Sequence, residues 1–176
     1  MKTGSRSLLF GVHQFILHPV TVLLAWIKLY GWPTWEEFIC IFIHDWGYWG
    51  CSNIEGKEGE CHPELAGKIA LYLLGDEAEY LCLFHSRNYA RRHNMQPSKL
   101  CWADKLSIIY DPWWLYLLRA WLSGELKEYR QKASLTGAVP LSASNREWHQ
   151  WLRSYYARLG REGHKNTNYE GEILCV

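Results

Sequence analysis

His44 and Asp45 place an imidazole beside a carboxylate at the end of a strongly apolar segment, Phe38 to Ile43. We expect such a segment to be buried, and a buried carboxylate is costly unless it is paired, hydrogen-bonded or bound to a metal ion. Adjacent helical residues point about 100° apart, so both side chains reach one ion only from a helix end or a local distortion. Taken alone, the dipeptide equally fits a core histidine followed by a turn residue.

Other imidazoles and one further carboxylate also fall on or beside apolar segments. Asp104 lies between Leu100 and Ile108 on a stripe with the spacing of a core-facing helix surface, and nothing nearby in the sequence obviously neutralises it. Several such groups on different helices of a small domain indicate that they converge. Imidazole combined with carboxylate suits Mn, Fe, Co, Ni or Zn. The histidines concerned are His13, His18, His62 and His85.

The elements that must position these groups are all helical. Thr34 with Glu37, Asp76 with Glu79, and Ser144 with Glu147 have the spacing of capping boxes that begin helices. We expect a break at Ser123-Gly124 and a mobile polar loop at 47–61, and no segment alternates as a strand does. The fold class predicted is all-α, with one helical domain at 1–160 and a polar C-terminal tail at 161–176. The expected helices cover about 20–30, 34–44, 63–75, 76–85, 98–108, 112–123 and 144–159.

Length and charge exclude several classes of protein. A length of 176 residues fits one domain. The net charge of +1 gives no overall electrostatic attraction to a nucleic-acid polymer or a membrane. The N-terminal apolar stretch is interrupted early and lacks a cleavage site, and no run reaches the ~18 apolar residues of a membrane span.

The cysteines and aromatic residues favour a reducing, cytoplasmic setting and a large aromatic core. None of the six cysteines forms a C-x-x-C motif, so a disulfide framework is not indicated. An irregular zinc site from Cys51, Cys61 and His62 is the alternative use of two of them.

The 11 Trp and 11 Tyr must fill a core, a pocket or a subunit interface, which leaves a homo-oligomer open. Six tryptophans are expected in the core or an interface: Trp26, Trp32, Trp35, Trp113, Trp114 and Trp121.

The order of His18, His44-Asp45 and Asp104 resembles the H…HD…D signature of the HD-domain superfamily of metal-dependent phosphohydrolases. The stretch Trp102 to Leu106 resembles that family's "ADK" helix, and the likeness covers roughly residues 10–120. It implies an HD-type helical bundle in which His18, His44, Asp45 and Asp104 ligate one metal ion. His13 is the competing choice for the first ligand.

The resemblance also suggests a second ion. His62 and His85 match two extra histidines of binuclear family members, in which the motif aspartate, here Asp45, bridges two ions. The segments His44 to Gly50 and His85 to Arg87 look like those of a bacterial and phage branch of the family. The implied cofactor is one or two divalent transition-metal ions (Mn, Fe, Co, Ni or Zn), with Mg a further candidate.

The implied activity is hydrolysis of a small phosphate ester by a metal-bound hydroxide, which forms near neutral pH. The expected substrate is a nucleotide: a deoxynucleoside triphosphate, a nucleoside monophosphate or a dinucleoside polyphosphate. The alternatives are a diiron oxygenase with the same extra histidines, and a non-catalytic module that binds a nucleotide or a metal.

Cations near the candidate ligands are expected to hold phosphate. Arg87 and Arg92 follow His85, and Arg92 would lie on nearly the same helix face about 10 Å along the axis. Lys105 adjoins Asp104 and is assigned both to phosphate binding and, with Asp45, to catalysis. The alternative for these cations is a solvated helix end that favours the helix dipole.

The loop at 47–60 is expected to form a lid over the site. Tyr48 and Trp49 would stack on a base, and Glu55 or Glu58 would shuttle a proton; Glu58 is the residue assigned to catalysis. The alternative is an exposed connector.

Overall fold

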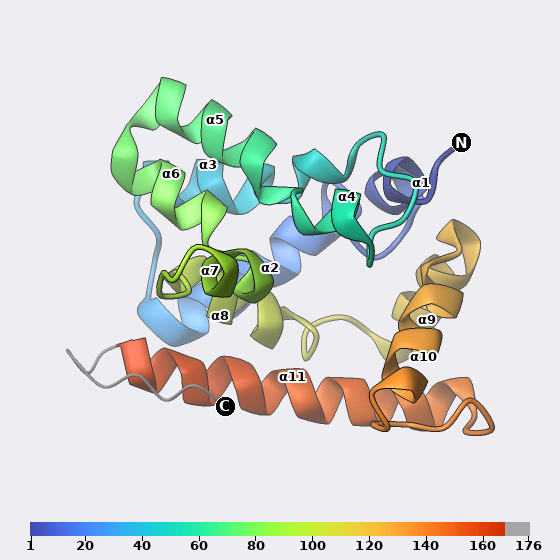
Figure 1. The fold of residues 1–176 in the computed structure, drawn as a ribbon. Helices are drawn as coiled ribbons and strands as arrows, with labels where there is room; N and C mark the ends of the chain where they lie inside the picture. The colour runs from blue at the N-terminus through green and yellow to red at the C-terminus, as the bar shows by residue number, and fades with distance from the viewer. Residues whose placement is uncertain (168–176) are drawn as a thin grey trace.

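The computed structural model describes residues 1–167. Their regular structure consists of helices with no β-strand among them, so the all-α fold predicted for the chain is confirmed (Figure 1). The elements are α1 (Thr3–Phe10), α2 (Leu17–Tyr30), α3 (Trp35–Ile43), the 3₁₀ helix η1 (Trp46–Tyr48), α4 (Lys57–Glu60), α5 (Pro63–Leu74), α6 (Asp76–Leu83), α7 (Arg87–Arg92), α8 (Lys99–Ser107), α9 (Trp113–Ser123), α10 (Glu125–Leu135) and α11 (Asn145–Thr167).

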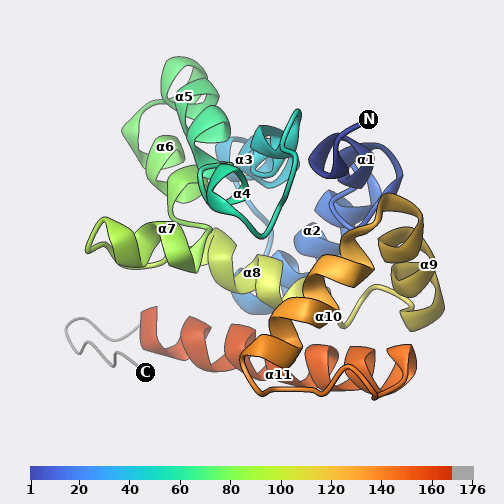
Figure 2. The same cartoon turned by 45° about the vertical axis from the view of Figure 1, so that its right-hand side comes forward.

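Helix α8 lies at the centre of the molecule and packs against both α2 and α11. The long helix α11 runs along one side, whereas the α5–α6 hairpin lies on the opposite side; α10 crosses near the N-terminal half of α11 (Figures 1 and 2). Six of the nine residues of α8 are buried, which is the pattern of a helix covered on several faces.

Two hydrophobic clusters stabilise the two halves of this arrangement. One joins α2, α3, α5, α6 and α8 around Trp26, Ile41 and Leu100. The other joins α9, α10 and α11 around Tyr116 and Trp148. Complete burial of each large apolar side chain contributes about 1.5–3 kcal/mol, so both clusters contribute substantially to the free energy of folding.

Two of the three predicted capping boxes are present at the starts of helices. Thr34 Oγ1 accepts from the Glu37 amide at 3.2 Å and Ser144 Oγ from the Glu147 amide at 3.2 Å, which confirms both capping boxes. The box predicted for Asp76 is wrong, because Asp76 is already the first residue of α6 and Gly75, with φ of +93°, precedes it. The break between α9 and α10 is confirmed at Gly124, whose φ of +91° favours glycine.

Other boundaries differ from those expected. The loop predicted at 47–61 contains the end of η1 and all of α4. Helix α2 begins at Leu17 rather than near Val20, so His18 lies in its first turn. Helix α11 continues to Thr167, so the tail predicted from residue 161 begins as helix, and its remainder at 168–176 lies outside the described residues.

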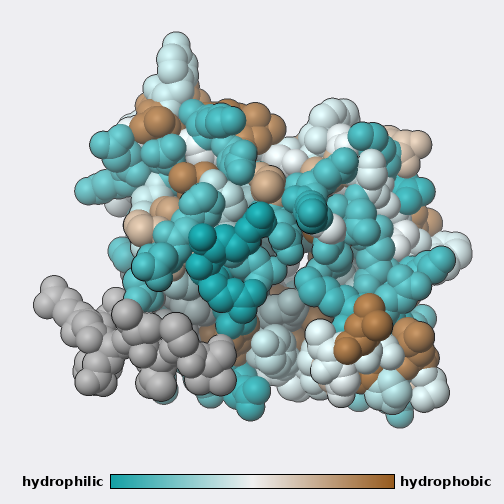
Figure 3. All heavy atoms as spheres, viewed as in Figure 1, coloured by the Kyte–Doolittle hydropathy of each residue, from teal (hydrophilic) through white to brown (hydrophobic). Residues whose placement is uncertain are grey.

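The tryptophans expected in the core or at an interface lie in different environments. Trp26 belongs to the core with 1% exposure, whereas Trp32, Trp35 and Trp121 are 83%, 62% and 66% exposed. The face in Figure 3 is mainly hydrophilic, with hydrophobic residues in small separate groups. Within the described part of the chain, no helix combines the length and the apolar character needed to cross a membrane.

Candidate metal centre

The end of α3 presents His44 and Asp45 to the interior. The helix ends at Ile43, His44 is its C-cap, and Asp45 adopts φ −96° and ψ 1° before η1 begins. This change of direction is the helix end that two adjacent ligands require, and both side chains are buried. Gly47 is needed directly afterwards, because a Cβ there would lie 1.9 Å from the carbonyl oxygen of His62.

One oxygen of Asp45 faces two imidazoles. Oδ2 lies 3.1 Å from Nε2 of His18 and 3.2 Å from Nε2 of His44. The same His18 nitrogen lies 3.2 Å from Oδ1 of Asp104, because α8 packs against α2. The structure therefore brings together the four residues expected to ligate the first ion.

The other oxygen of Asp45 faces the second pair of histidines. Oδ1 lies 3.5 Å from Nε2 of His62 and 3.4 Å from Nε2 of His85. His62 is the N-cap of α5, and His85 lies in the turn after α6, so the α5–α6 hairpin brings these two residues together. Their Nε2 atoms are only 2.9 Å apart.

Backbone contacts fix which nitrogen of three imidazoles carries hydrogen. Nδ1 of His44, His62 and His85 lies 2.8, 2.6 and 2.5 Å from the carbonyl oxygens of Ile41, Gly59 and Cys82, respectively. A carbonyl oxygen only accepts, so each Nδ1 donates and each neutral ring presents a lone pair at Nε2. Such N–H donation to a backbone carbonyl is the usual support of a metal-binding histidine.

Several buried polar atoms here lack a partner in the described chain. Nε2 of His18, Nε2 of His44 and Oδ2 of Asp45 make no hydrogen bond of acceptable geometry, although they lie close together. Ligand atoms about 2.1 Å from one ion are about 3.0–3.4 Å apart in octahedral or tetrahedral geometry, similar to the separations found here. The cluster can therefore hold a metal ion, and the donor atoms of His18, His44 and Asp104 all lie within 4.8 Å of one another, as do those of His44, Asp45 and His85.

The electrostatics of the cluster suit a cation. Burial lowers the pKa of His62 and His85, which favours their neutral forms. Burial also opposes the ionised forms of Asp45 and Asp104, yet His44 beside the first and Lys105 beside the second keep both pKa values well below the usual range.

His18 behaves differently from these two histidines because it faces two carboxylates. Burial lowers its pKa, but the neighbouring carboxylates of Asp104 and Asp45 outweigh burial and raise the pKa of His18 to about 9. A cation bound at Nε2 would replace the proton that these carboxylates otherwise stabilise.

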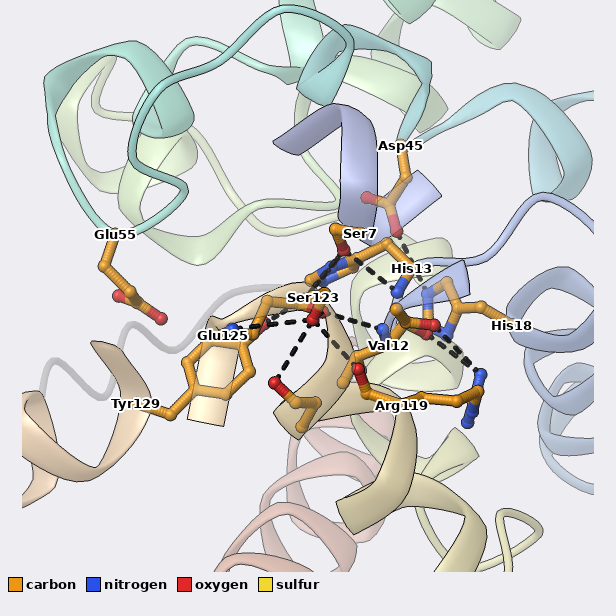
Figure 4. Close-up of polar contacts among 12 residues, drawn as sticks. Ser7, Val12, His13, His18, Asp45, Glu55, Arg119, Ser123, Glu125 and Tyr129 are labelled. Atoms are coloured by element: carbon orange, nitrogen blue, oxygen red, sulfur yellow. Dashed lines mark hydrogen bonds and ion pairs between the residues drawn. The ribbon is translucent and has the colours of Figure 1, made fainter. Parts of the chain in front are cut away.

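His13, the alternative first ligand, belongs to a neighbouring network instead. Its Nδ1 lies 3.0 Å from Oε1 of Glu125, which also accepts from Ser7 Oγ at 2.7 Å and Tyr129 Oη at 3.0 Å. Figure 4 shows Ser7, His13 and Ser123 gathered around Glu125, with His18 and Asp45 to one side. Sequence reasoning missed Glu125, because an acid in the first turn of a polar helix has no distinguishing signal.

A cavity of about 510 Å³ adjoins the cluster, with His18 and Asp104 among its walls. Two predicted substrate-binding residues also line it. Lys105 Nζ lies 2.7 Å from Oδ2 of Asp104, and the ring of Tyr48 stacks on His62 with centroids 4.0 Å apart.

The two candidate proton shuttles are placed differently. Glu55 lines the cavity and pairs with Lys132. Glu58 is exposed, does not line the cavity, and accepts from the Ser52 amide at 2.7 Å.

The remaining predicted substrate residues do not line the cavity. The chain turns at Phe84–Ser86, and Ser86 caps α7, so His85 and Arg92 do not share one helix face and that expectation is wrong. Arg92 is 52% exposed and pairs with Glu60 at 2.8 Å. Arg87 is half-buried at the start of α7, and Trp49 is 57% exposed.

The irregular zinc site that included His62 is also excluded. Among the described residues, the donor atoms of Cys51, Cys61 and His62 do not lie close enough together to share an ion, and Cys51 Sγ donates instead to the Gly47 carbonyl. No disulfide forms among the described cysteines.

Comparison of the chain with family models, with curated proteins and with solved structures finds no match. The donor atoms and their surroundings are therefore the grounds for assigning chemistry to the centre. Neutral imidazoles and ionised carboxylates beside a cavity suit binding of a transition-metal ion and of a small molecule next to it.

Proposed function

We propose that this protein is a metal-dependent phosphohydrolase of the HD-domain type that acts on a nucleotide. The observation that supports this proposal most directly is the position of Asp45. One of its oxygens faces His18 and His44, and the other faces His62 and His85. This arrangement supports two divalent ions bridged by Asp45, with Asp104 completing the first ligand set.

The side chains of the chain have separable roles in this proposal. A divalent ion in such a site lowers the pKa of a coordinated water and neutralises phosphate oxygens. Asp45 would contribute one oxygen to each of the two ion sites. Lys105, whose Nζ lies 2.7 Å from Asp104, would supply a positive charge for a phosphate oxygen. Glu55 is the carboxylate of the lid segment that lines the cavity, so we assign proton transfer to it in preference to Glu58.

The test of this function is phosphate release from a panel of nucleoside mono-, di- and triphosphates and dinucleoside polyphosphates. Each would be assayed with Mn, Co, Fe, Zn or Mg after removal of bound ions. We expect metal-dependent release from at least one class. A protein that binds metal but releases no phosphate from any member would contradict the proposal and favour the non-catalytic module.

Substitution of Asp104 tests the site itself. Asp104→Asn is expected to lower metal content and reduce phosphate release to near background. The substitution removes the charged carboxylate that faces His18 and keeps the shape of the side chain. The helical circular dichroism should be retained. Glu58→Gln is the matched control, since that exposed carboxylate accepts only from a loop amide. Equal activity of Asp104→Asn and the parent protein would show that the site is assigned incorrectly.

A diiron oxygenase is the second candidate, favoured by the four imidazoles around Asp45. Oxygen consumption by the ferrous protein would have to depend on an added organic phosphonate or polyol. Phosphate release in the absence of oxygen would favour the hydrolase.

A further inference from the structure

The cavity beside the metal centre has a second end made of aromatic side chains. One end includes His18 and Asp104, and the other is formed largely by helices α10 and α11. Its volume of about 510 Å³ is in the range of sites for small organic ligands. The aromatic residues in its walls are Tyr116, Tyr129, Trp148, Trp151, Tyr155 and Tyr156.

These rings are arranged as flat surfaces. Trp148 stacks with Tyr129 at an interplanar angle of 13°, and Trp151 stacks with Tyr155 at 13°. Trp148 is 1% exposed, and its buried Nε1 makes no hydrogen bond within the described chain. Because Trp148 is almost fully buried, its ring is a fixed part of the cavity wall.

The charges of the cavity limit the charge of its ligand. Lys105 and Lys132 are the lysine or arginine residues in its described walls, and they pair with Asp104 and Glu55. Arg92, which could have held a polyphosphate tail, is not a wall residue. Apart from bound metal ions, the described walls therefore offer no lysine or arginine without a carboxylate partner to hold further phosphates.

We infer that the site takes a phosphate monoester with a planar aromatic group, of which a nucleoside monophosphate is the biological form. Its phosphate lies at the metal centre beside Lys105, and its ring lies among the tyrosines and tryptophans of α10 and α11. This inference rests on the proposed function for the phosphate end, whereas the aromatic end binds its group independently of any reaction. We expect a nucleoside triphosphate to bind less tightly than the monophosphate, because the cavity walls lack lysine or arginine side chains free of a carboxylate partner.

Binding measurements on the full chain test this inference without turnover. Nucleosides, their 5′-monophosphates and their triphosphates would be titrated by tryptophan fluorescence and equilibrium dialysis, with Mn²⁺ and with chelator. We expect at least one nucleoside to bind with and without Mn²⁺, and its monophosphate to bind roughly tenfold more tightly than the nucleoside when Mn²⁺ is present. Tighter binding of the triphosphate, or no binding of any nucleoside, would overturn the inference.

A variant at the cavity rim locates the binding. Ala138 is exposed and lines the cavity, so Ala138→Trp is expected to fill the aromatic end and weaken nucleoside binding by roughly tenfold or more, with metal content unchanged. Leu135→Trp is the matched control, because Leu135 is the last residue of α10, is 88% exposed and is not a wall residue.

The outcomes separate this inference from the proposed function. Nucleoside binding that Ala138→Trp abolishes would support the aromatic site even if no phosphate were released from any ester. Phosphate release with equal efficiency from a ring-free monoester such as glycerol phosphate, together with unaltered nucleoside binding in Ala138→Trp, would overturn the aromatic site and leave the hydrolase in place.

Discussion

At the scale of single residues, the site depends on buried carboxylates whose two oxygens face different sets of neighbours. Asp45 distributes its two oxygens between two pairs of imidazoles, and Glu125 accepts hydrogen bonds on both of its own. Glu125 contacts His13, which lines the same cavity as His18, so the hydrogen bonds around Glu125 adjoin the candidate centre. Burial raises and hydrogen bonding lowers the pKa of Glu125, with hydrogen bonding from His13 prevailing.

Glu125→Gln is therefore expected to destabilise the fold although it changes one atom. The amide nitrogen would replace an oxygen that accepts from Ser7 and Tyr129 or from Val12 and Ser123, leaving buried donors unsatisfied. We expect a loss of about 2–4 kcal/mol in unfolding free energy, measured by urea denaturation. Glu77→Gln on the exposed face of α6 is the control and should change stability by less than about 0.5 kcal/mol. A similar small change in Glu125→Gln would contradict the assigned network.

At the scale of secondary-structure elements, the centre depends on close contact between η1 and the start of α5. Gly47 lies where a Cβ would be 1.9 Å from the His62 carbonyl oxygen, so any larger residue must separate the two segments. Since Asp45 and His62 sit on opposite sides of this contact, a separation would move a carboxylate away from an imidazole.

Gly47→Ala is thus expected to weaken metal binding as well as the fold. Overpacking of this kind costs about 1–3 kcal/mol, and the displaced His62 should reduce the number of ions bound. Elemental analysis and thermal denaturation would measure the two effects. Gly56→Ala is a milder control, because a Cβ there would lie 3.3 Å from Cγ of the Asn53 side chain and needs a shift of only a few tenths of an ångström. Full metal content in Gly47→Ala would show that the contact does not position His62.

His149, at the contact between α9 and α11, is expected to make the stability of the fold depend on pH. His149 is 1% exposed, its ring lies 4.9 Å from that of Tyr116, and burial together with Arg153 lowers its pKa to about 4. Between the ordinary pKa of about 6.5 and this value, the unfolded chain binds a proton that the folded chain does not. Stability should therefore fall as pH falls from about 6.5 to 4, with no further loss from this group below that.

His149→Gln should flatten the fall in stability over that pH range. Urea denaturation of the variant and parent at several pH values between 4 and 7 would measure the slope. His93→Gln, at an exposed position, serves as the control and should keep the slope of the parent. An identical slope in His149→Gln would mean that other groups cause the dependence.

At the scale of the whole molecule, sequence reasoning succeeded where chemistry and helix pattern coincide. Polar groups on apolar helical segments indicated that several imidazoles and carboxylates converge, and the resemblance of their order to the HD signature selected His18, His44, Asp45 and Asp104 from these candidates. The same reasoning failed for Arg92, because the turn at Phe84–Ser86 interrupts a continuous helical pattern.

Contacts between distant segments could not be derived from spacing. Glu125 meets His13 across 112 residues, and the aromatic part of the cavity is formed largely by α10 and α11, which pack beside a centre built from residues 18–104. Neither arrangement has a local sequence pattern, since it depends on how complete helices pack against one another.

The centre joins α2, the end of α3, the start of α5, the turn after α6, and α8, so metal binding should stabilise the whole fold. A ligand that binds only the folded chain adds about 2.7 kcal/mol when its free concentration is 100 times its dissociation constant. For a domain of this size, that corresponds to a rise in melting temperature of roughly 5–10 °C. Calorimetry with Mn²⁺ and with chelator would measure the rise, which Asp104→Asn should largely remove. Identical melting temperatures under both conditions would contradict a metal centre that ties these helices together.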